Sequence, residues 1–199
     1  MSYESIPGWF AFGAAYDEMV DLAVDGDAII EIGVAFGRSL AYLARRVIDS
    51  GKKVRVIGVD PWLPRWDPHP DHPHGLGLGG EHADLVMRLG GPFKAFEHMM
   101  LTHALDEYAR VDAFRGTSEE AAQVFYGVQP VGVLIDGSHD YAEVKRDIEL
   151  WLPRVASRGG ILAGDDWEPR EFPGVVQACD EAFGRSGYEV RGTTWIRRT

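Results

Sequence analysis

The sequence predicts an α/β fold in which a mostly parallel, doubly wound sheet has helices on both faces. Short apolar segments alternate with amphipathic helical segments along the chain, and such alternation produces parallel strands joined by crossing helices. The segment Ala28–Gly37, AIIEIGVAFG, has the pattern of a strand, a tight glycine turn and the start of a helix. The next apolar run, Val54–Asp60, ends in a carboxylate, the second feature of a nucleoside-binding edge.

Each element is predicted from its local pattern. In Trp9–Val24 the apolar residues recur at spacings of three and four, which predicts an amphipathic helix. Pro92 suits the first turn of a helix over Pro92–Tyr108, and Thr117 with Glu120 forms a capping box before a helix over Ser118–Tyr126. The other expected helices are Ser39–Ile48, Glu81–Leu89, Tyr141–Leu152 and Val175–Phe183. The expected strands are Ala28–Ile32, Val54–Asp60, Val111–Phe114, Val131–Asp136, Gly160–Ala163, Tyr188–Arg191 and Thr194–Ile196, the last two forming an antiparallel pair.

Length and composition limit the classes of protein to consider. A chain of 199 residues with 45% hydrophobic and 26% charged residues predicts one globular domain over residues 1–199. The sequence has no apolar run of about 20 residues and no signal-peptide pattern, so no membrane partner is expected. The single cysteine, Cys179, suits a reducing cytoplasm. A net charge of −11 argues against nucleic acid and favours a small-molecule partner.

The segment Pro61–Gly80 has no periodicity because prolines and glycines interrupt it, which predicts a mobile loop that closes over a ligand. Two tryptophans in it, Trp62 and Trp66, are expected near the cofactor edge, where they could stack on a ring or pack in the core. A zinc site is an alternative use of this segment, although alternating prolines would scatter the side chains. Its ligands would come from Asp67, His69, Asp71, His72 and His74.

Acidic residues follow two strands that should be neighbours. Asp136 ends the fourth strand, and Asp165 and Asp166 follow the fifth. Adjacent strands lie about 4.8 Å apart, so these carboxylates should converge and repel one another unless a hard cation such as Mg²⁺ neutralises them. The alternative is that they are polar strand ends and helix caps. His139, in the turn after the fourth strand, is a candidate proton acceptor or a turn residue bonded to backbone. Asp140 is expected to cap the next helix.

The order of five segments resembles the class I S-adenosylmethionine-dependent methyltransferases. The segments are EIGVAFGRS, GVDPW, GTSEEA, LIDGSHDY and GGILAGDDW, and the resemblance covers the chain from Ala28 to Trp167. It is strongest to small O-methyltransferases related to the catechol and caffeoyl-CoA enzymes and to sugar- and antibiotic-tailoring members. The resemblance implies a Rossmann-like, seven-stranded sheet with a C-terminal antiparallel hairpin.

The resemblance also implies roles for particular residues. Glu31, Gly33 and Gly37 form the first cofactor loop, Ser39 lies near the methionine carboxylate, and Asp60 binds the ribose hydroxyls. Ser118 is expected at the adenine edge, and Trp62 and Asp136 beside the cofactor. Asp165 and Asp166 follow Asp136 by 29 and 30 residues, the spacing of the metal ligands in the metal-dependent branch. His139 stands where that branch has a basic residue, often lysine, and Asp166 where the catechol-type enzymes have asparagine.

The resulting hypothesis is a cytoplasmic methyltransferase that moves a methyl group to the hydroxyl of a small molecule. A divalent metal held by Asp136, Asp165 and Asp166 would lower the pKa of that hydroxyl, and His139 would remove its proton. Alternatives are a metal-independent methyltransferase, a cephalosporin-hydroxylase-like tailoring enzyme that shares the DGSHDY pattern, a non-catalytic cofactor-binding module and a nicotinamide dehydrogenase. The aromatic N-terminal helix suits packing against a second copy of the chain.

Overall fold

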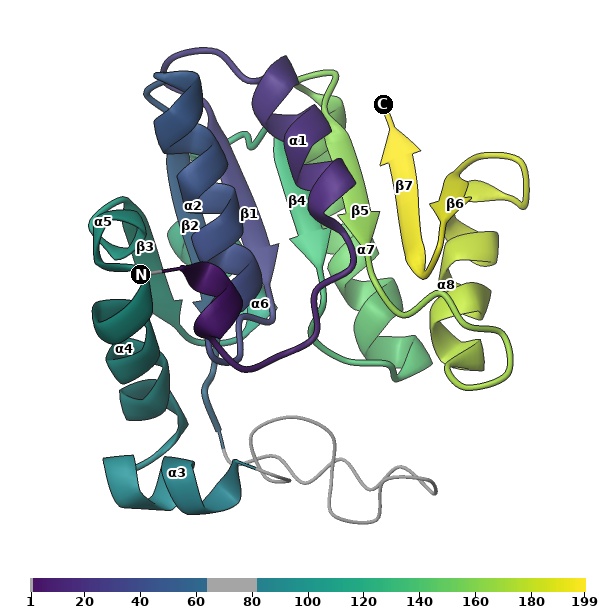
Figure 1. Cartoon of the computed structure of the whole chain (residues 1–199). Coiled ribbons are helices and arrows are strands. Elements are labelled where there is room, and N and C mark those ends of the chain that lie inside the picture. The colour runs from purple at the N-terminus through teal and green to yellow at the C-terminus, as the bar shows by residue number, and fades with distance from the viewer. Residues whose placement is uncertain (1, 64–81) are drawn as a thin grey trace.

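A seven-stranded sheet runs through the computed structural model, which describes residues 2–63 and 82–199 (Figure 1). The strand order is β3-β2-β1-β4-β5-β7-β6, so the predicted fold class is confirmed. Strands β1 to β5 are parallel to one another, and β7 runs antiparallel to both of its neighbours, β5 and β6. The strands are β1 Ala28–Ile32, β2 Arg55–Asp60, β3 Val111–Arg115, β4 Gly132–Ile135, β5 Ile161–Gly164, β6 Glu189–Arg191 and β7 Thr194–Arg198.

Helices cover both faces of the sheet, and each face has its own hydrophobic cluster. One cluster includes Tyr16, Leu43 and Phe96, which come from α1, α2 and α4. The opposite cluster includes Trp151 of α7 and Cys179 of α8, together with alanines of α6. The helices are α1 Gly13–Leu22, α2 Arg38–Ser50, α3 Ala83–Leu89, α4 Pro92–His103, α5 Leu105–Tyr108, α6 Ser118–Val124, α7 Tyr141–Ala156 and α8 Pro173–Phe183, with a 3-10 turn, η1, over Tyr3–Ser5.

The predicted helices differ from the observed ones by a few residues at their ends, and two of the differences have a clear cause in tertiary packing. The helix expected over Pro92–Tyr108 breaks at Ala104, whose backbone leaves the helical region, and α5 then turns back toward α2, where Arg45 donates a 2.7 Å hydrogen bond to Glu107. The helix expected to stop at Leu152 continues through Pro153, because the next turn buries Val155 against the sheet. Tertiary packing therefore overrides the local signal at both positions.

The turn after β1 brings two crossover connections into direct contact. Gly33 has a φ of +86°, and a Cβ at this position would lie 2.0 Å from the carbonyl oxygen of Asp136. Gly37 has a φ of +90°, and its Cβ would meet the sulfur of Met100 at 2.7 Å. Only glycine fits either conformation without displacing its neighbours. The end of β1 therefore lies against the segment that follows β4, whose first residue is Asp136.

The loop and zinc-site predictions for Pro61–Gly80 lie almost wholly outside the described residues, which resume at His82. Across the described ranges, no helix has both the length and the apolar character needed to span a bilayer.

Candidate active site

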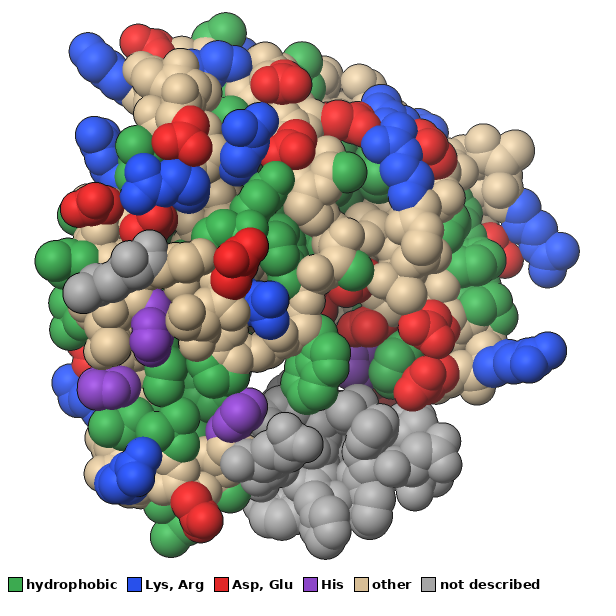
Figure 2. Space-filling view, viewed as in Figure 1, with side chains coloured by type: hydrophobic (Ala, Val, Ile, Leu, Met, Phe, Trp, Pro, Cys, Tyr) green, Lys and Arg blue, Asp and Glu red, His purple; other side chains and the backbone are tan. Residues whose placement is uncertain are grey.

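A cavity of about 400 Å³ opens at the carboxyl ends of the parallel strands. This is the edge at which open α/β sheets bind ligands, and the volume falls in the range of small-molecule sites. Figure 2 shows acidic side chains and a histidine gathered in a hollow of this face. The predicted site residues that line the cavity are Gly33, Ser39, Asp60, Ser118, Asp136, His139, Asp165 and Asp166.

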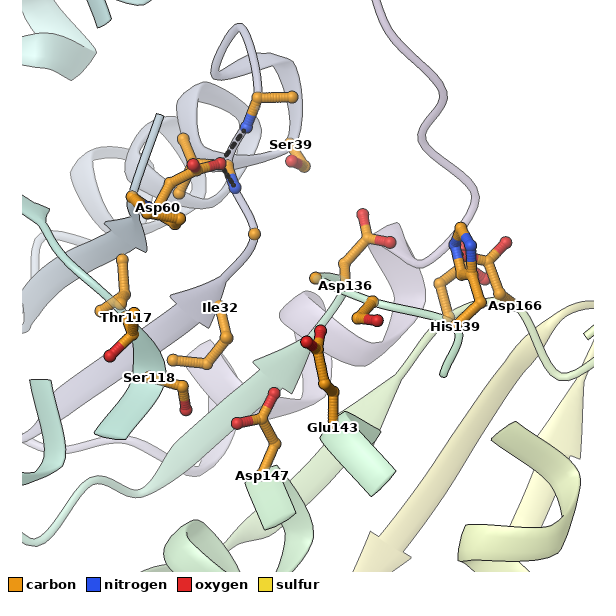
Figure 3. Close-up of a pocket in the computed structure, with 18 of the residues that line it drawn as sticks. Ile32, Ser39, Asp60, Thr117, Ser118, Asp136, His139, Glu143, Asp147 and Asp166 are labelled. Atoms are coloured by element: carbon orange, nitrogen blue, oxygen red, sulfur yellow. Dashed lines mark hydrogen bonds and ion pairs between the residues drawn. The ribbon is translucent and has the colours of Figure 1, made fainter. Parts of the chain in front are cut away.

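Asp60, at the end of β2, points toward the turn after β1 (Figure 3). Its Oδ2 accepts hydrogen bonds from the backbone N–H groups of Val34, at 2.9 Å, and Ala35, at 3.0 Å. Its Oδ1 accepts another, at 2.6 Å, from the backbone N–H of Trp62. The carboxylate thus lines the cavity and also holds the glycine turn in place. Its predicted contact with ribose stays a prediction, and its anchoring role was not foreseen from the sequence.

Glu31 is fully buried in β1 and does not line the cavity. The Ser39 hydroxyl donates a 2.5 Å hydrogen bond to its Oε1, and the buried hydroxyl of Tyr16 lies beside it. Burial raises the pKa of Glu31 to about 8, partly offset by these hydroxyls, so its neutral form is favoured. The cofactor-loop role predicted for Glu31 is therefore indirect in this structure: it holds Ser39, which lines the cavity.

The buried carboxyl of Glu31 predicts a pH-dependent stability that Glu31→Gln removes. The pKa of about 8 exceeds the ordinary 4.5, so the stabilisation is complete below pH 4.5 and is lost as pH rises toward 8. Between pH 5 and 8 the wild-type free energy of unfolding should fall by a few kcal/mol, and that of Glu31→Gln should fall much less. Urea unfolding at several pH values measures this, with the exposed Glu4→Gln as control. Parallel curves for wild type and Glu31→Gln would contradict the burial argument.

Trp62 lies in the core and does not line the cavity, and packing in the core is the alternative stated for it above. Its side chain is 1% exposed and packs against Phe93 and Phe96, with ring centroids 5.0 and 4.7 Å away. Its indole N–H donates a 2.8 Å hydrogen bond to the carbonyl of Ala35. The ring therefore supports the turn after β1 from behind. Gly37, the N-cap of α2, likewise does not line the cavity.

The three aspartates lie at neighbouring strand ends, as predicted. Ile135 of β4 pairs with Gly164 of β5, and the N–H of Asp165 donates a 3.1 Å hydrogen bond to the Ile135 carbonyl. Burial, and then the charges of Asp166 and Asp165, hold the pKa of Asp136 well above its usual range. Burial also raises the pKa of Asp165, against the effect of a 2.5 Å hydrogen bond from the Thr193 hydroxyl.

These carboxylates do not gather around one point. Within residues 2–63 and 82–199, no three acidic, histidine or cysteine side chains form a group that could hold a metal ion. Asp165 is engaged by Thr193, and Asp166 by His139. The donor chemistry suits a hard cation, but the arrangement does not fit the predicted three-carboxylate site, because two of its ligands are turned to other partners.

His139 pairs with Asp166 across the turn after β4. Its Nε2 lies 2.7 Å from Oδ2 of Asp166, and its ring stacks on Phe172 with a centroid separation of 4.1 Å. In Figure 3, the imidazole lies between Asp136 and Asp166 at one end of the cavity. A histidine whose ring is oriented by a carboxylate is the arrangement of a general base. Asp140 caps α7 through a 2.9 Å hydrogen bond from the N–H of Ala142, as predicted.

Sequence reasoning missed two acidic residues that α7 presents to the cavity. Glu143 and Asp147 are four residues apart, so they share one helix face, and both line the cavity beyond Asp136 (Figure 3). The signal was present in the sequence, because a helix that follows the strand ending at Asp136 must begin beside the site.

Trp9, which is 75% exposed, was expected to lie in a helix but belongs to an irregular segment that lines the cavity.

Comparisons with known proteins agree with this geometry. The sequence model of a family described as a methyltransferase domain matches residues 30–167. An O-methyltransferase from Bacillus cereus, solved in complex with SAH, has 15% identity and a TM-score of 0.59, with 98% of this chain and 84% of that chain covered. The O-methyltransferase NovP has 17% identity and a TM-score of 0.61, with 94% of this chain and 77% of that chain covered. CalS11, a calicheamicin methyltransferase, has 19% identity and a TM-score of 0.58, with 93% of this chain and 76% of that chain covered. No curated protein sequence matches the chain.

At these identities the solved structures establish the fold, and the family match covers more than half of the chain. The family match favours a methyltransferase over the nicotinamide dehydrogenase considered above. The chain belongs to the methyltransferase-domain family and is a class I S-adenosylmethionine-dependent methyltransferase.

Proposed function

We propose that this methyltransferase acts on a hydroxyl group of a small molecule. The observation that carries the proposal is the His139–Asp166 pair, which faces the same cavity as Asp60 and Ser118. A proton acceptor at that position is what an O-methyltransferase needs, because a hydroxyl must lose its proton during transfer. The names of the similar solved structures, O-methyltransferases and an antibiotic methyltransferase, support this substrate class.

The cavity has groups suited to each part of the cofactor. Asp60 would bind the ribose hydroxyls, Ser118 would lie at the adenine edge, and Ser39 with the turn after β1 would face the methionine portion. Apolar side chains of Ile32, at the end of β1, and Val59, in β2, supply the floor on which a nucleoside can lie. When bound, S-adenosylmethionine supplies an activated methyl group on a sulfonium.

His139 takes the acceptor's proton as the new oxygen–carbon bond forms and the sulfur–carbon bond breaks. Asp166 holds the imidazole in place and stabilises the imidazolium that results. Phe172 packs on the ring and restricts its rotation. The remaining contribution is positioning, because the protein must align oxygen, methyl carbon and sulfur in one line. The sulfur product of the transfer would be S-adenosylhomocysteine, a neutral thioether.

No step in this mechanism passes through a metal, so turnover should survive chelation. Asp165 and Asp166 are already hydrogen-bonded to Thr193 and His139, and the described residues form no metal group. After treatment with EDTA and desalting, methyl transfer is expected to stay within about twofold of the untreated rate, a change too small to reflect loss of a metal that stabilises the transition state. Product formation measured with and without added Mg²⁺ checks this.

Metal-assisted transfer is the second candidate, favoured because the charges of Asp166 and Asp165 add to burial in raising the pKa of Asp136. A bound cation would relieve that repulsion. Loss of activity on chelation, restored by Mg²⁺, would establish this candidate in place of the first.

The proposed function is tested by incubating the protein with S-adenosylmethionine and a panel of small hydroxyl compounds. Formation of S-adenosylhomocysteine together with a methyl ether is the expected result. Cofactor binding without product on any acceptor would favour the non-catalytic binding module instead.

A further inference from the structure

Asp147 is a buried acidic residue on the cavity wall that the mechanism above does not use. It lies in α7 with 9% of its surface exposed, and its carboxyl group faces the cavity next to Ser118 (Figure 3). A carboxylate withdrawn from water is costly unless donors satisfy its oxygens. The neighbouring Arg146 directs its Nε to Glu119, 2.9 Å away.

The hydrogen bonds of Ser118 show what Asp147 does in this wall. The indole N–H of Trp151 donates a 2.9 Å hydrogen bond to the Ser118 oxygen. Ser118 is also hydrogen-bonded to the Asp147 side chain, which lowers the pKa of that carboxyl group against the larger effect of burial. A hydroxyl has a single proton, so Ser118 accepts from Trp151 and donates to Asp147. Ser118 therefore orients Asp147 and has no proton left for a ligand.

At Asp147 the wall consequently offers acceptor oxygens to the part of a ligand that lies there, and the Ser118 hydroxyl adds no donor. Burial raises the pKa of Asp147 only to about 6, so the group is ionised at neutral pH. The carboxylate has more acceptor sites than the one that Ser118 occupies. A ligand edge with N–H groups would satisfy them, and an edge with a carbonyl oxygen would be repelled.

We propose that Asp147 accepts a hydrogen bond from the exocyclic amine of the cofactor's adenine and so selects a 6-amino purine over a 6-oxo purine. The proposal rests on the proposed use of this cavity for S-adenosylmethionine. It places the base between the Thr117–Ser118 turn and α7, on the far side of the ribose from the His139–Asp166 pair. The adenine-edge residue is then Asp147, with Ser118 as its positioning residue.

The test is calorimetric binding of S-adenosylhomocysteine and S-inosylhomocysteine. The purine edge of the first has a 6-amino group beside an acceptor N1, and that of the second has a 6-oxo group beside an N1–H, so the two ligands differ at the position that Asp147 would contact. Wild type is expected to bind the adenosyl ligand at least about tenfold more tightly, the effect of one hydrogen bond to a charged group. Asp147→Asn should weaken the adenosyl ligand by about tenfold and bind the inosyl ligand as well or better, since its amide can donate to the 6-oxo group. Glu149→Gln, an exposed acidic residue on the same helix, should match wild type.

Each other outcome overturns the inference. Equal affinity of wild type for the two ligands overturns the inference. This comparison needs no variant, so it remains decisive even if Asp147→Asn does not fold. Equal weakening of both ligands by a folded Asp147→Asn shows a structural role only. Absence of binding of either ligand to wild type instead refutes the proposed function on which this inference rests.

Discussion

Asp60→Ala is expected to weaken binding of S-adenosylhomocysteine by about 100-fold or more. The substitution removes the proposed contact with both ribose hydroxyls, each a charge-assisted hydrogen bond. It also removes the acceptor for the N–H groups of Val34 and Ala35, so the glycine turn loses its anchor. Titration calorimetry measures the loss, and thermal unfolding shows whether the variant is folded.

Asp49→Ala is the matched control for this experiment. Asp49 lies at the exposed end of α2 and pairs with Arg45 at 3.6 Å, away from the cavity. Its substitution should leave affinity unchanged. A folded Asp60→Ala that binds within about threefold of wild type would show that neither the ribose contact nor the anchored turn is needed.

His139→Ala is expected to lower turnover by about 10²- to 10⁴-fold, the usual contribution of a general base. The affinity for S-adenosylhomocysteine should stay within about threefold, because His139 lies at the end of the cavity with Asp166 and not beside Asp60. Single-turnover assays with saturating acceptor separate this chemical effect from binding. The control is His98→Ala, an exposed histidine of α4 that does not line the cavity.

Turnover within tenfold of wild type in His139→Ala would contradict its role as base. Rescue of the lost activity at high pH, where the acceptor ionises without help, would support it. A parallel loss of affinity would instead indicate that His139 supports the cavity wall.

Much of the architecture was predictable because local patterns determine where strands and helices form. The strand over Ala28–Ile32 was predicted with its observed bounds, and the capping box at Thr117 and Glu120 is present. The failures occur where packing decides. Nothing near Ala104 marks the break between α4 and α5, and Pro153 marks a helix end that burial of Val155 overrides.

The site was predicted less completely, because the spacing of residues along the chain does not reveal which side chains are buried and which line the cavity. Asp60 and Asp136 line the cavity as expected, since residues at parallel strand ends must meet at one edge. Glu31 and Trp62 are one or two residues from such positions, and yet their side chains are buried. Alternation along β1 turns the side chain of Glu31 away from that of Ile32, which lines the cavity. Trp62 lies beyond the end of β2, and its ring packs back against Phe93 and Phe96.

The amino-acid sequence alone determined the order of strands and helices, the glycine turn after β1 and the acidic residues at the ends of β2, β4 and β5. The tertiary structure alone decided that His139 meets Asp166, that Asp60 anchors the turn and that Ser118 orients Asp147. These partners are 25 to 29 residues apart or come from different crossover units. Their contact depends on strand register and on how α7 packs against the sheet, and local periodicity encodes neither.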